Sequence, residues 1–220
     1  MADPFEITFS FRNKRFTDAS AGLRAFATQL RRDWDGSTTV LSKEMKSFLD
    51  GVAQALAQRH GAGWPGGTGA MSLSKRSGNL VNAIVGSVQV NGSTFTTIAG
   101  QIGAPGVPYA KIQETGGTIR PKTAKFLAIP LPAALDGNGV PLRAGPRDWD
   151  KTFCAMSKAG NLIIFRKLGA VITPLYVLKD QVTIPARLGM RKTLEAGVPY
   201  FVDHAIAAIM AKMREGAGAG

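Results

Sequence analysis

The chain has 220 residues, of which 45% are hydrophobic, and a formal net charge of +12 from 27 basic and 15 acidic side chains. This composition excludes wholesale disorder and fits one large domain or two small ones. No apolar run approaches the roughly 20 residues of a membrane span, and residues 1–6 lack the features of a signal peptide, so we expect a soluble, intracellular protein. The charge indicates a polyanionic neighbour, nucleic acid first and membrane headgroups second, or a protein that is merely soluble and basic.

Residues 1–60 are predicted to form a strand and two helices that pack on the core. Apolar and polar side chains alternate over residues 6–12, which is the pattern of a half-buried strand, and the chain then turns. Apolar residues recur with helical spacing over about 18–32 and again over about 38–59. The Asp-Gly-Ser-Thr run at 35–38 is typical of a helix break, and its hydroxyl groups suit an N-cap.

A glycine-rich connector is expected over residues 61–71. Its one aromatic residue, Trp64, has two interpretations. An exposed tryptophan in a mobile loop often anchors an interface, whereas a tryptophan that folds back covers the core. Both interpretations stay open at this point.

The middle of the chain is predicted to contain a helix and several strands. The helix begins near residue 74 and ends near 84, and strands 85–90 and 93–99 flank Asn91-Gly92, a strong hairpin signal. Residues 118–121 and 125–130 are predicted to be paired strands.

The last third begins with a long segment, 133–150, that is rich in glycine, proline and aspartate and has no periodicity. Such a segment is usually a binding loop or lid, or is mobile. A hairpin follows over 152–156 and 162–165. Further strands are expected at 170–172, 175–178 and 182–184, the first two separated by Pro174, before a long helix over 190–213 and a frayed tail, 216–220.

The residues that could carry metal or nucleophilic chemistry are poorly placed. His60 and His204 lie far apart, and Asp203 beside His204 points about 100° away on a helix, so they cannot easily share a metal ion. The only cysteine, Cys154, has no histidine within its hairpin and is expected to be a buried structural thiol.

Carboxylates offer the remaining enzymatic alternative. Asp148 and Asp150 lie on one side of an extended segment, as an acid/base pair or a divalent-cation site requires, but a solvated loop is the preferred interpretation. Glu114 is the only acid among residues 61–132, and we expect a structural ion pair with Lys111, Arg120 or Lys122.

Nucleic-acid readout motifs are missing from the sequence. There is no zinc-finger spacing, no RNA-recognition signature and no compelling helix-turn-helix. Arg120, Lys122 and Lys125 could lie along one hairpin and contact phosphates. Such contacts would be independent of base sequence and would weaken steeply with salt.

Several short motifs occur in a fixed order along residues 72–215. They are Ser77, Gly78 and Leu80; Tyr109, Glu114, Gly116 and Gly117; Phe-Leu-Ala-Ile-Pro at 126–130; and Val-Thr-Ile-Pro-Ala-Arg at 182–187, which includes Pro185 and Arg187. In this order they resemble the virion morphogenesis proteins of tailed phages, the tail-completion or head–tail joining group. The segment 133–150 is an insertion relative to that pattern.

The resemblance implies an α+β fold, with a small, partly curved antiparallel sheet packed by N-terminal helices and a long C-terminal helix. It implies a ring, expected to be six-fold, around the DNA channel in the neck or tail of the virion, assembled in the host cytoplasm. The implied partners are other copies of the chain, connector or head-closure proteins, tail-terminator or tail-tube proteins, and double-stranded DNA that passes through. It implies no enzymatic activity, cofactor, metal or membrane.

Five residues are candidates for the DNA channel or for subunit interfaces: Arg120, Lys122, Lys125, Trp64 and Arg187. Pro185 would start the closing segment, and Arg187 would pin it by bonding a carboxylate or carbonyl, either towards Glu114 or on a neighbouring chain. The alternative to a virion protein is a sequence-neutral DNA-binding protein that acts outside the mature particle.

Overall fold

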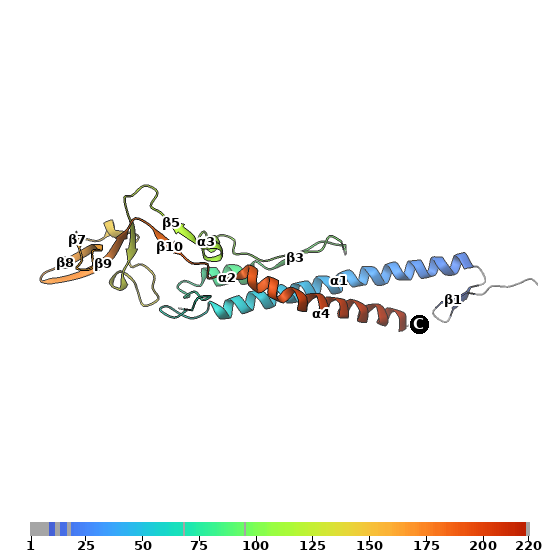
Figure 1. Cartoon of the computed structure of the whole chain (residues 1–220). Helices are drawn as coiled ribbons and strands as arrows, with labels where there is room; N and C mark the ends of the chain where they lie inside the picture. Colours follow the sequence, from blue (N-terminus) through green and yellow to red (C-terminus); the bar gives the residue numbers. More distant parts are fainter. Residues whose placement is uncertain (1–8, 12–13, 17–18, 68, 95, 219–220) are drawn as a thin grey trace, which may run out of the picture. The chain divides into compact units, whose positions relative to one another are not determined.

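The computed structural model describes residues 9–11, 14–16, 19–67, 69–94 and 96–218 (Figure 1). The chain divides into two compact units, which do not follow its linear order. The first unit comprises Met1–Val52, Val88–Ile102 and Leu194–Gly220, and the second comprises Ala53–Ser87 and Gly103–Thr193. The fold is α+β, as expected, with a long C-terminal helix.

Helix α1 (Ala19–Arg59) is one continuous helix, so the predicted break at 35–38 is wrong. Ser37 is completely buried, and the hydroxyl of Thr38 lies 3.5 Å from the carbonyl of Trp34 one turn earlier. The Cβ position of Gly36 lies 3.9 Å from Lys212 of α4 (Met190–Gly218). Small side chains that suggest a cap therefore lie inside a packed helix, where burial outweighs their preference for a helix end.

Within the first unit, α1 and α4 pack through aromatic side chains. The rings of Phe48 and Phe201 stack with centroids 5.1 Å apart. Gly197 permits this contact, because a Cβ there would lie 2.6 Å from the Phe48 ring. Leu49, which follows Phe48 on α1, and Ala205, one turn after Phe201 on α4, are also buried. The predicted long C-terminal helix is confirmed, with Pro199 inside it.

Two short hairpins complete the first unit. Strand β1 (Phe9–Phe11) pairs with β2 (Lys14–Phe16), so the predicted first strand is confirmed for its described part. Residues 14–16 form a second strand antiparallel to it, where the sequence predicted a turn. Strands β3 (Gln89–Asn91) and β4 (Ala99–Gln101) form a hairpin, but the predicted strands 85–90 and 93–99 and their turn at Asn91-Gly92 are wrong. Asn91 ends β3 and pairs with Ala99, and the described residues that connect the strands include Thr94 and Thr97, whose hydroxyls lie 2.7 Å apart.

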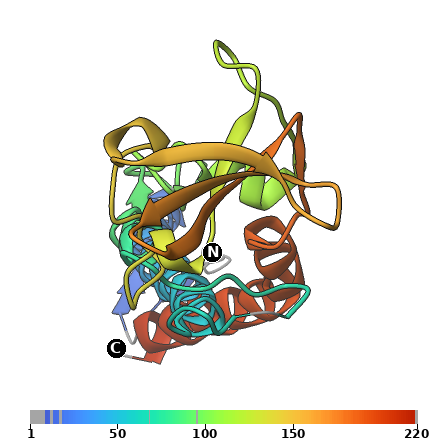
Figure 2. The same ribbon diagram turned by 90° about the vertical axis from the view of Figure 1, so that its left-hand side faces the viewer.

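The second unit contains a four-stranded antiparallel sheet of order β6-β9-β8-β7 (Figure 2). Its strands are β6 (Leu127–Pro130), β9 (Val171–Lys179), β8 (Leu162–Leu168) and β7 (Thr152–Met156). The predicted β7–β8 hairpin is confirmed. Pro174 does not separate two strands, because the register of β8 and β9 shifts between Ile164 and Phe165 and accommodates it.

The strand partners in this unit differ from those expected. Strand β5 (Gly117–Ile119) pairs with β10 (Val182–Ile184), which confirms that late strand, while β6 pairs with β9. The prediction that 118–121 pairs with 125–130 is therefore wrong. Closeness in sequence favoured that hairpin, but both segments instead pair with strands far along the chain.

Two backbone hydrogen bonds join the connector to the segment that precedes the second helix. The amide of Lys75 donates to Ala62, and the amide of Trp64 donates to the Lys75 carbonyl. These bonds hold residue 75 in an extended bridge, so α2 (Asn79–Gly86) begins at Asn79, later than predicted. Helix α3 (Ala110–Thr115) follows β4 along the chain.

The insertion at 133–150 is part of the core rather than an open lid. It includes the 3-10 helices η1 (Pro132–Ala134) and η2 (Pro146–Asp148). Ala134 is fully buried in a cluster with Leu175 and Tyr176, against which Trp149 packs. The indole of Trp149 also donates a 3.1 Å hydrogen bond to the Tyr176 hydroxyl.

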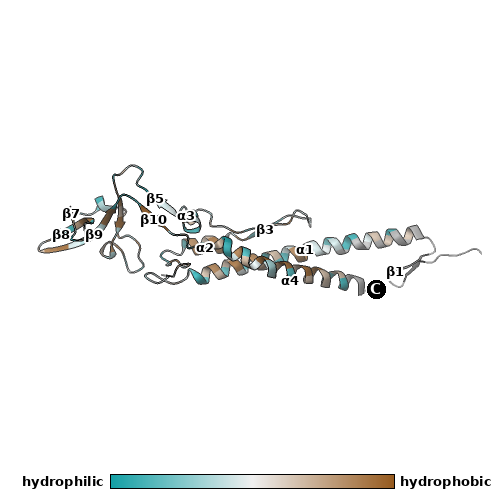
Figure 3. Cartoon of the chain, viewed as in Figure 1, coloured by the Kyte–Doolittle hydropathy of each residue, from teal (hydrophilic) through white to brown (hydrophobic). Residues whose placement is uncertain are grey.

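Apolar residues follow much of α4 and the strands of the second unit (Figure 3). In the described part of the chain, no helix is both long and apolar enough to span a membrane.

Candidate functional site

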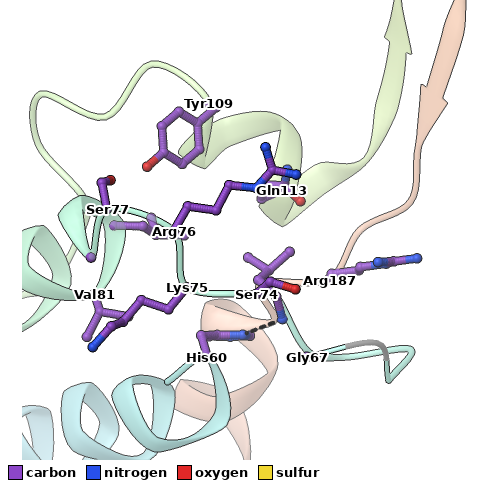
Figure 4. Close-up of a pocket in the computed structure, with 13 residues that line it drawn as sticks. His60, Gly67, Ser74, Lys75, Arg76, Ser77, Val81, Tyr109, Gln113 and Arg187 are labelled. Carbon is purple, nitrogen blue, oxygen red and sulfur yellow. Dashed lines mark hydrogen bonds between the residues drawn. The ribbon is translucent and has the colours of Figure 1, made fainter. Parts of the chain in front are cut away.

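A cavity of about 440 Å³ lies within the second unit (Figure 4). Its walls come from the end of α1, the segment before α2, the first turn of α2, α3 and the segment after β10. The polar and charged side chains on which its chemistry depends are Lys75, Arg76, Ser77, Tyr109, Gln113 and Arg187. The cavity thus gathers residues from parts of the sequence that are far apart.

His60 closes one wall of the cavity and is structural. It is 1% exposed, and its Nε2 donates to the carbonyl of Leu188 at 3.0 Å while its Nδ1 accepts from the amide of Leu73 at 3.1 Å. Burial lowers the pKa of His60 most, the Leu188 carbonyl raises it, and the charge of Arg59 lowers it further. Both ring nitrogens are occupied, so neither can bind a metal or move a proton.

The lining is cationic and contains no carboxylate. Among the residues that the structure describes, the side chains of Lys75 and Arg76 make no ion pair. Figure 4 shows the guanidinium of Arg76 reaching across towards Gln113, with the hydroxyl of Tyr109 directed towards Ser77. A concave site with unpaired cations, a phenol and an amide can bind an anion through charge-assisted hydrogen bonds.

Arg187 lies beside this cavity but does not meet Glu114. Its main-chain amide donates to the Gln113 carbonyl at 2.7 Å, whereas its side-chain Nε is buried without a partner in the described structure. The segment after β10 is therefore pinned by its backbone rather than by the guanidinium. The expected side-chain bond from Arg187 to a carboxylate or carbonyl is absent at Nε.

Glu114 has a different role from the expected ion pair. Its Oε2 accepts from the amide of Met190 at 2.8 Å, and its Oε1 accepts from the amide of Arg191 at 3.0 Å. These are free amides of the first turn of α4, so the carboxylate caps that helix. Its partners are thus backbone amides rather than Lys111, Arg120 or Lys122.

Gly116 and Gly117 of the motif have positive φ angles, which side chains rarely permit. Gly116 has φ of +68°, and a Cβ there would lie 3.0 Å from the amide nitrogen of Ala186 and 3.1 Å from the carbonyl oxygen of Ile184. Gly117 also has a positive φ. The tight turn after Glu114 therefore requires glycine, as the sequence indicated.

Asp148 and Asp150, the candidate acid/base pair, each bind a different structural partner. Asp148 accepts from the amide of Gly145 at 2.9 Å, and Asp150 forms an ion pair with Arg166. The hydrogen bond from Arg166 is the main cause that lowers the pKa of Asp150. No group of three or more metal-ligating side chains occurs among the residues that were described.

Three more candidates are placed as follows. Cys154 is exposed, so the prediction of a buried thiol is wrong, because β7 is an edge strand. Trp64 is half-buried, and a Cβ at Gly139 would lie 2.7 Å from its indole, which places it against the insertion. Pro185, the candidate for the start of the closing segment, is exposed.

The basic candidates form an exposed cluster. Arg120, Lys122 and Lys125 are all exposed in the connection between β5 and β6, which projects from the unit in Figure 2. Lys125 lies 5.3 Å from the centre of the Phe126 ring. They do not line the cavity.

Sequence reasoning missed Lys75, Arg76 and Gln113. The only local signal was two adjacent cations directly before the Ser77-Gly78 helix start. Comparisons with protein-family models, with curated proteins and with solved structures found no match to this chain.

Proposed function

We propose that this chain is a structural protein of a tailed-phage virion, placed at the neck or tail end. It completes the tail and joins it to the head connector as a ring around the DNA channel. One observation carries the proposal: motif residues from three distant segments meet in one unit. Ser77, Gly78, Leu80, Tyr109 and Arg187 line the same cavity.

The bonds around the motifs support a structural role. The carbonyl of Gln113 accepts from the amides of Arg187 and Leu188, at 2.7 and 2.8 Å. Glu114, the next residue, caps α4, and β5 pairs with β10. Glu114 and the strand that follows it therefore hold two distant segments together, as expected of a structural protein.

Exposed apolar side chains also support assembly. On α4, Val202 is 42% exposed, Ile206 52% and Met210 50%, at a spacing of four residues. Single exposed apolar residues are ordinary, but a repeated series along one helix suits a surface that neighbouring subunits cover. In a ring, the cationic cavity would receive an acidic side chain of a neighbouring protein.

The proposal is tested on particles and on the purified chain. Purified chain should give a ring-sized mass by size-exclusion chromatography with light scattering, and rings by negative-stain microscopy. A labelled copy should appear at the neck or tail end of virions. Mature particles that lack the protein would contradict the proposal.

A second candidate function is sequence-neutral DNA binding outside the particle. It is favoured by the exposed cluster of Arg120, Lys122 and Lys125. Changing all three to alanine should abolish salt-dependent binding of duplex DNA by the isolated chain. The matched control changes three exposed lysines elsewhere, Lys43, Lys158 and Lys167, and should retain binding if the cluster is specific. Equal loss in both variants would indicate net charge alone.

A further inference from the structure

Within the part of the chain that the structure describes, strand β7 (Thr152–Met156) is an edge of the four-stranded sheet and pairs only with β8 (Figure 1). The hydrogen-bond pattern tells which of its backbone groups face outward. The amide of Lys167 donates to the carbonyl of Lys151, and the amide of Ser157 donates to the carbonyl of Asn161. Both pairs lie directly opposite in the β7–β8 register.

In an antiparallel ladder, hydrogen-bonded residues alternate with residues whose backbone groups face the other way. Because residues 151 and 157 bond towards β8, so do Phe153 and Ala155 between them. The amides and carbonyls of Thr152, Cys154 and Met156 therefore point out of the sheet. This edge offers three outward-facing residues, centred on Cys154.

The edge lacks the features that usually prevent strand pairing. The five residues of β7 contain no proline and no charged side chain. Met156 is 64% exposed and Phe153 is 39% exposed. An apolar, unprotected edge of this kind is a template for an extended strand.

We propose that β7 pairs with β7 of a second copy of this chain, antiparallel and with the two-fold axis at Cys154. In this register Cys154 lies opposite Cys154 of the second copy, and Thr152 lies opposite Met156. All three outward-facing residues are then used, giving about six hydrogen bonds across the axis. A shift by one residue would set outward-facing groups opposite groups already bonded to β8.

Side-chain sizes fit the same register. Phe153 falls opposite the small Ala155, so that a large side chain meets a small one on each side of the axis. The five residues of β7 are therefore complementary to themselves in this register, which favours a second copy over an unrelated strand. This pairing does not depend on the proposed function.

The test uses the full chain and its single cysteine. Residues opposite each other in a hydrogen-bonded antiparallel pair have Cα atoms about 5.5 Å apart, within the range that a disulfide spans. Mild oxidation, or a short bismaleimide, should therefore link two chains through Cys154 at low protein concentration. No covalent dimer under either treatment would overturn the proposal.

Shifted cysteines test the register. The double variants Thr152→Cys/Cys154→Ser and Met156→Cys/Cys154→Ser should each fail to cross-link alone, since residue 152 lies about 14 Å along the strand from its own copy at roughly 3.4 Å per residue. Mixed together, they should cross-link with each other. Efficient cross-linking of either variant alone would contradict the register.

Pairing itself is tested by Cys154→Pro. The amide of residue 154 faces outward, so proline removes no bond to β8 and should leave the sheet folded. Light scattering should give this variant half the particle mass of the unchanged chain. Met156→Lys, which adds a charge to the edge, should have the same effect. Unchanged mass in both variants would overturn the proposal, while a ring that persists after dissociation at β7 would leave the proposed function standing.

Discussion

Glu114 caps a helix that begins 76 residues later in the chain, with its Oε2 2.8 Å from the amide nitrogen of Met190. Its other oxygen accepts from the next amide, that of Arg191. The carboxylate thereby serves two of the amides that a helix start leaves without partners, and its charge lies at the positive end of the helix dipole. One side chain thus links the central motif to the start of α4.

Changing Glu114 to alanine should lower the free energy of unfolding by about 1–2 kcal/mol, because capping and dipole interactions are both lost. Glu114→Gln should cost less, since the amide oxygen can still accept one bond. Urea-induced unfolding measures both. The control is Glu195→Gln on the exposed surface of α4, which should change stability by less than about 0.5 kcal/mol. Equal effects at the two positions would argue against a cap.

Gly116→Ala should destabilise the protein by about 1–3 kcal/mol. The residue has a positive φ, and the new methyl group would press on the backbone of Ile184 and Ala186. Gly137→Ala is the matched control, because nothing lies within 4 Å of its Cβ position. Thermal unfolding of the two variants should differ clearly. A neutral Gly116→Ala variant would show that the turn after Glu114 relaxes freely.

Stability should fall as the pH is lowered below about 6.5, the usual pKa of histidine. Burial lowers the pKa of His60 in the folded state, so the unfolded chain binds the proton more readily. Stability from this group is therefore complete above the unfolded pKa and is lost as the pH falls towards the folded one. Unfolding titrations between pH 5 and 8 measure this.

The two histidines provide a matched pair for that experiment. His60→Gln should reduce the pH dependence between 5 and 7, whereas His204→Gln, on the exposed face of α4, should retain it. His60→Ala should also cost about 2 kcal/mol or more at pH 8, because the Leu188 carbonyl and Leu73 amide lose their partner. If His204→Gln removed the pH dependence instead, the assignment would be wrong.

Local patterns predicted the elements whose partners lie nearby or whose apolar stripe is long. The β7–β8 hairpin, strand β10 and helix α4 were all expected, because alternation and helical spacing are written in consecutive residues. The break at 35–38 was not observed, since Ser37 is buried and packing outweighs a weak capping preference.

Strand partners and the exposure of side chains could not be predicted from local sequence patterns. Nothing within residues 117–119 says that they pair with 182–184 rather than with a neighbouring strand. Cys154 sits in an apolar run, yet it is exposed because β7 lies at the edge of its sheet. Strand order is a property of the whole unit, so the exposure of a single strand cannot be predicted from its own residues.

The candidate site was predicted only in part. Tyr109, Ser77, Gly78 and Arg187 were singled out as motif residues, but not as neighbours around a cavity. Lys75 and Arg76 were missed, because two adjacent cations are usually a solvated surface feature. Their significance comes from the backbone bonds between residues 62–64 and 75, which place them at the cavity.

The cavity should bind a carboxylate through Arg76 if, as proposed above, it receives an acidic side chain of a neighbouring protein. The probe is a short capped peptide with one glutamate between two leucines, compared with the same peptide carrying glutamine. Isothermal titration should detect binding of the glutamate peptide, and Arg76→Gln should weaken it about tenfold or more, the loss of one charge-assisted hydrogen bond. Arg147→Gln, an exposed arginine outside the cavity, is the control and should leave binding unchanged. Equal affinity for the two peptides, or equal weakening by the two arginine changes, would show that the cavity does not recognise a carboxylate, because Arg76 lines the cavity and Arg147 does not.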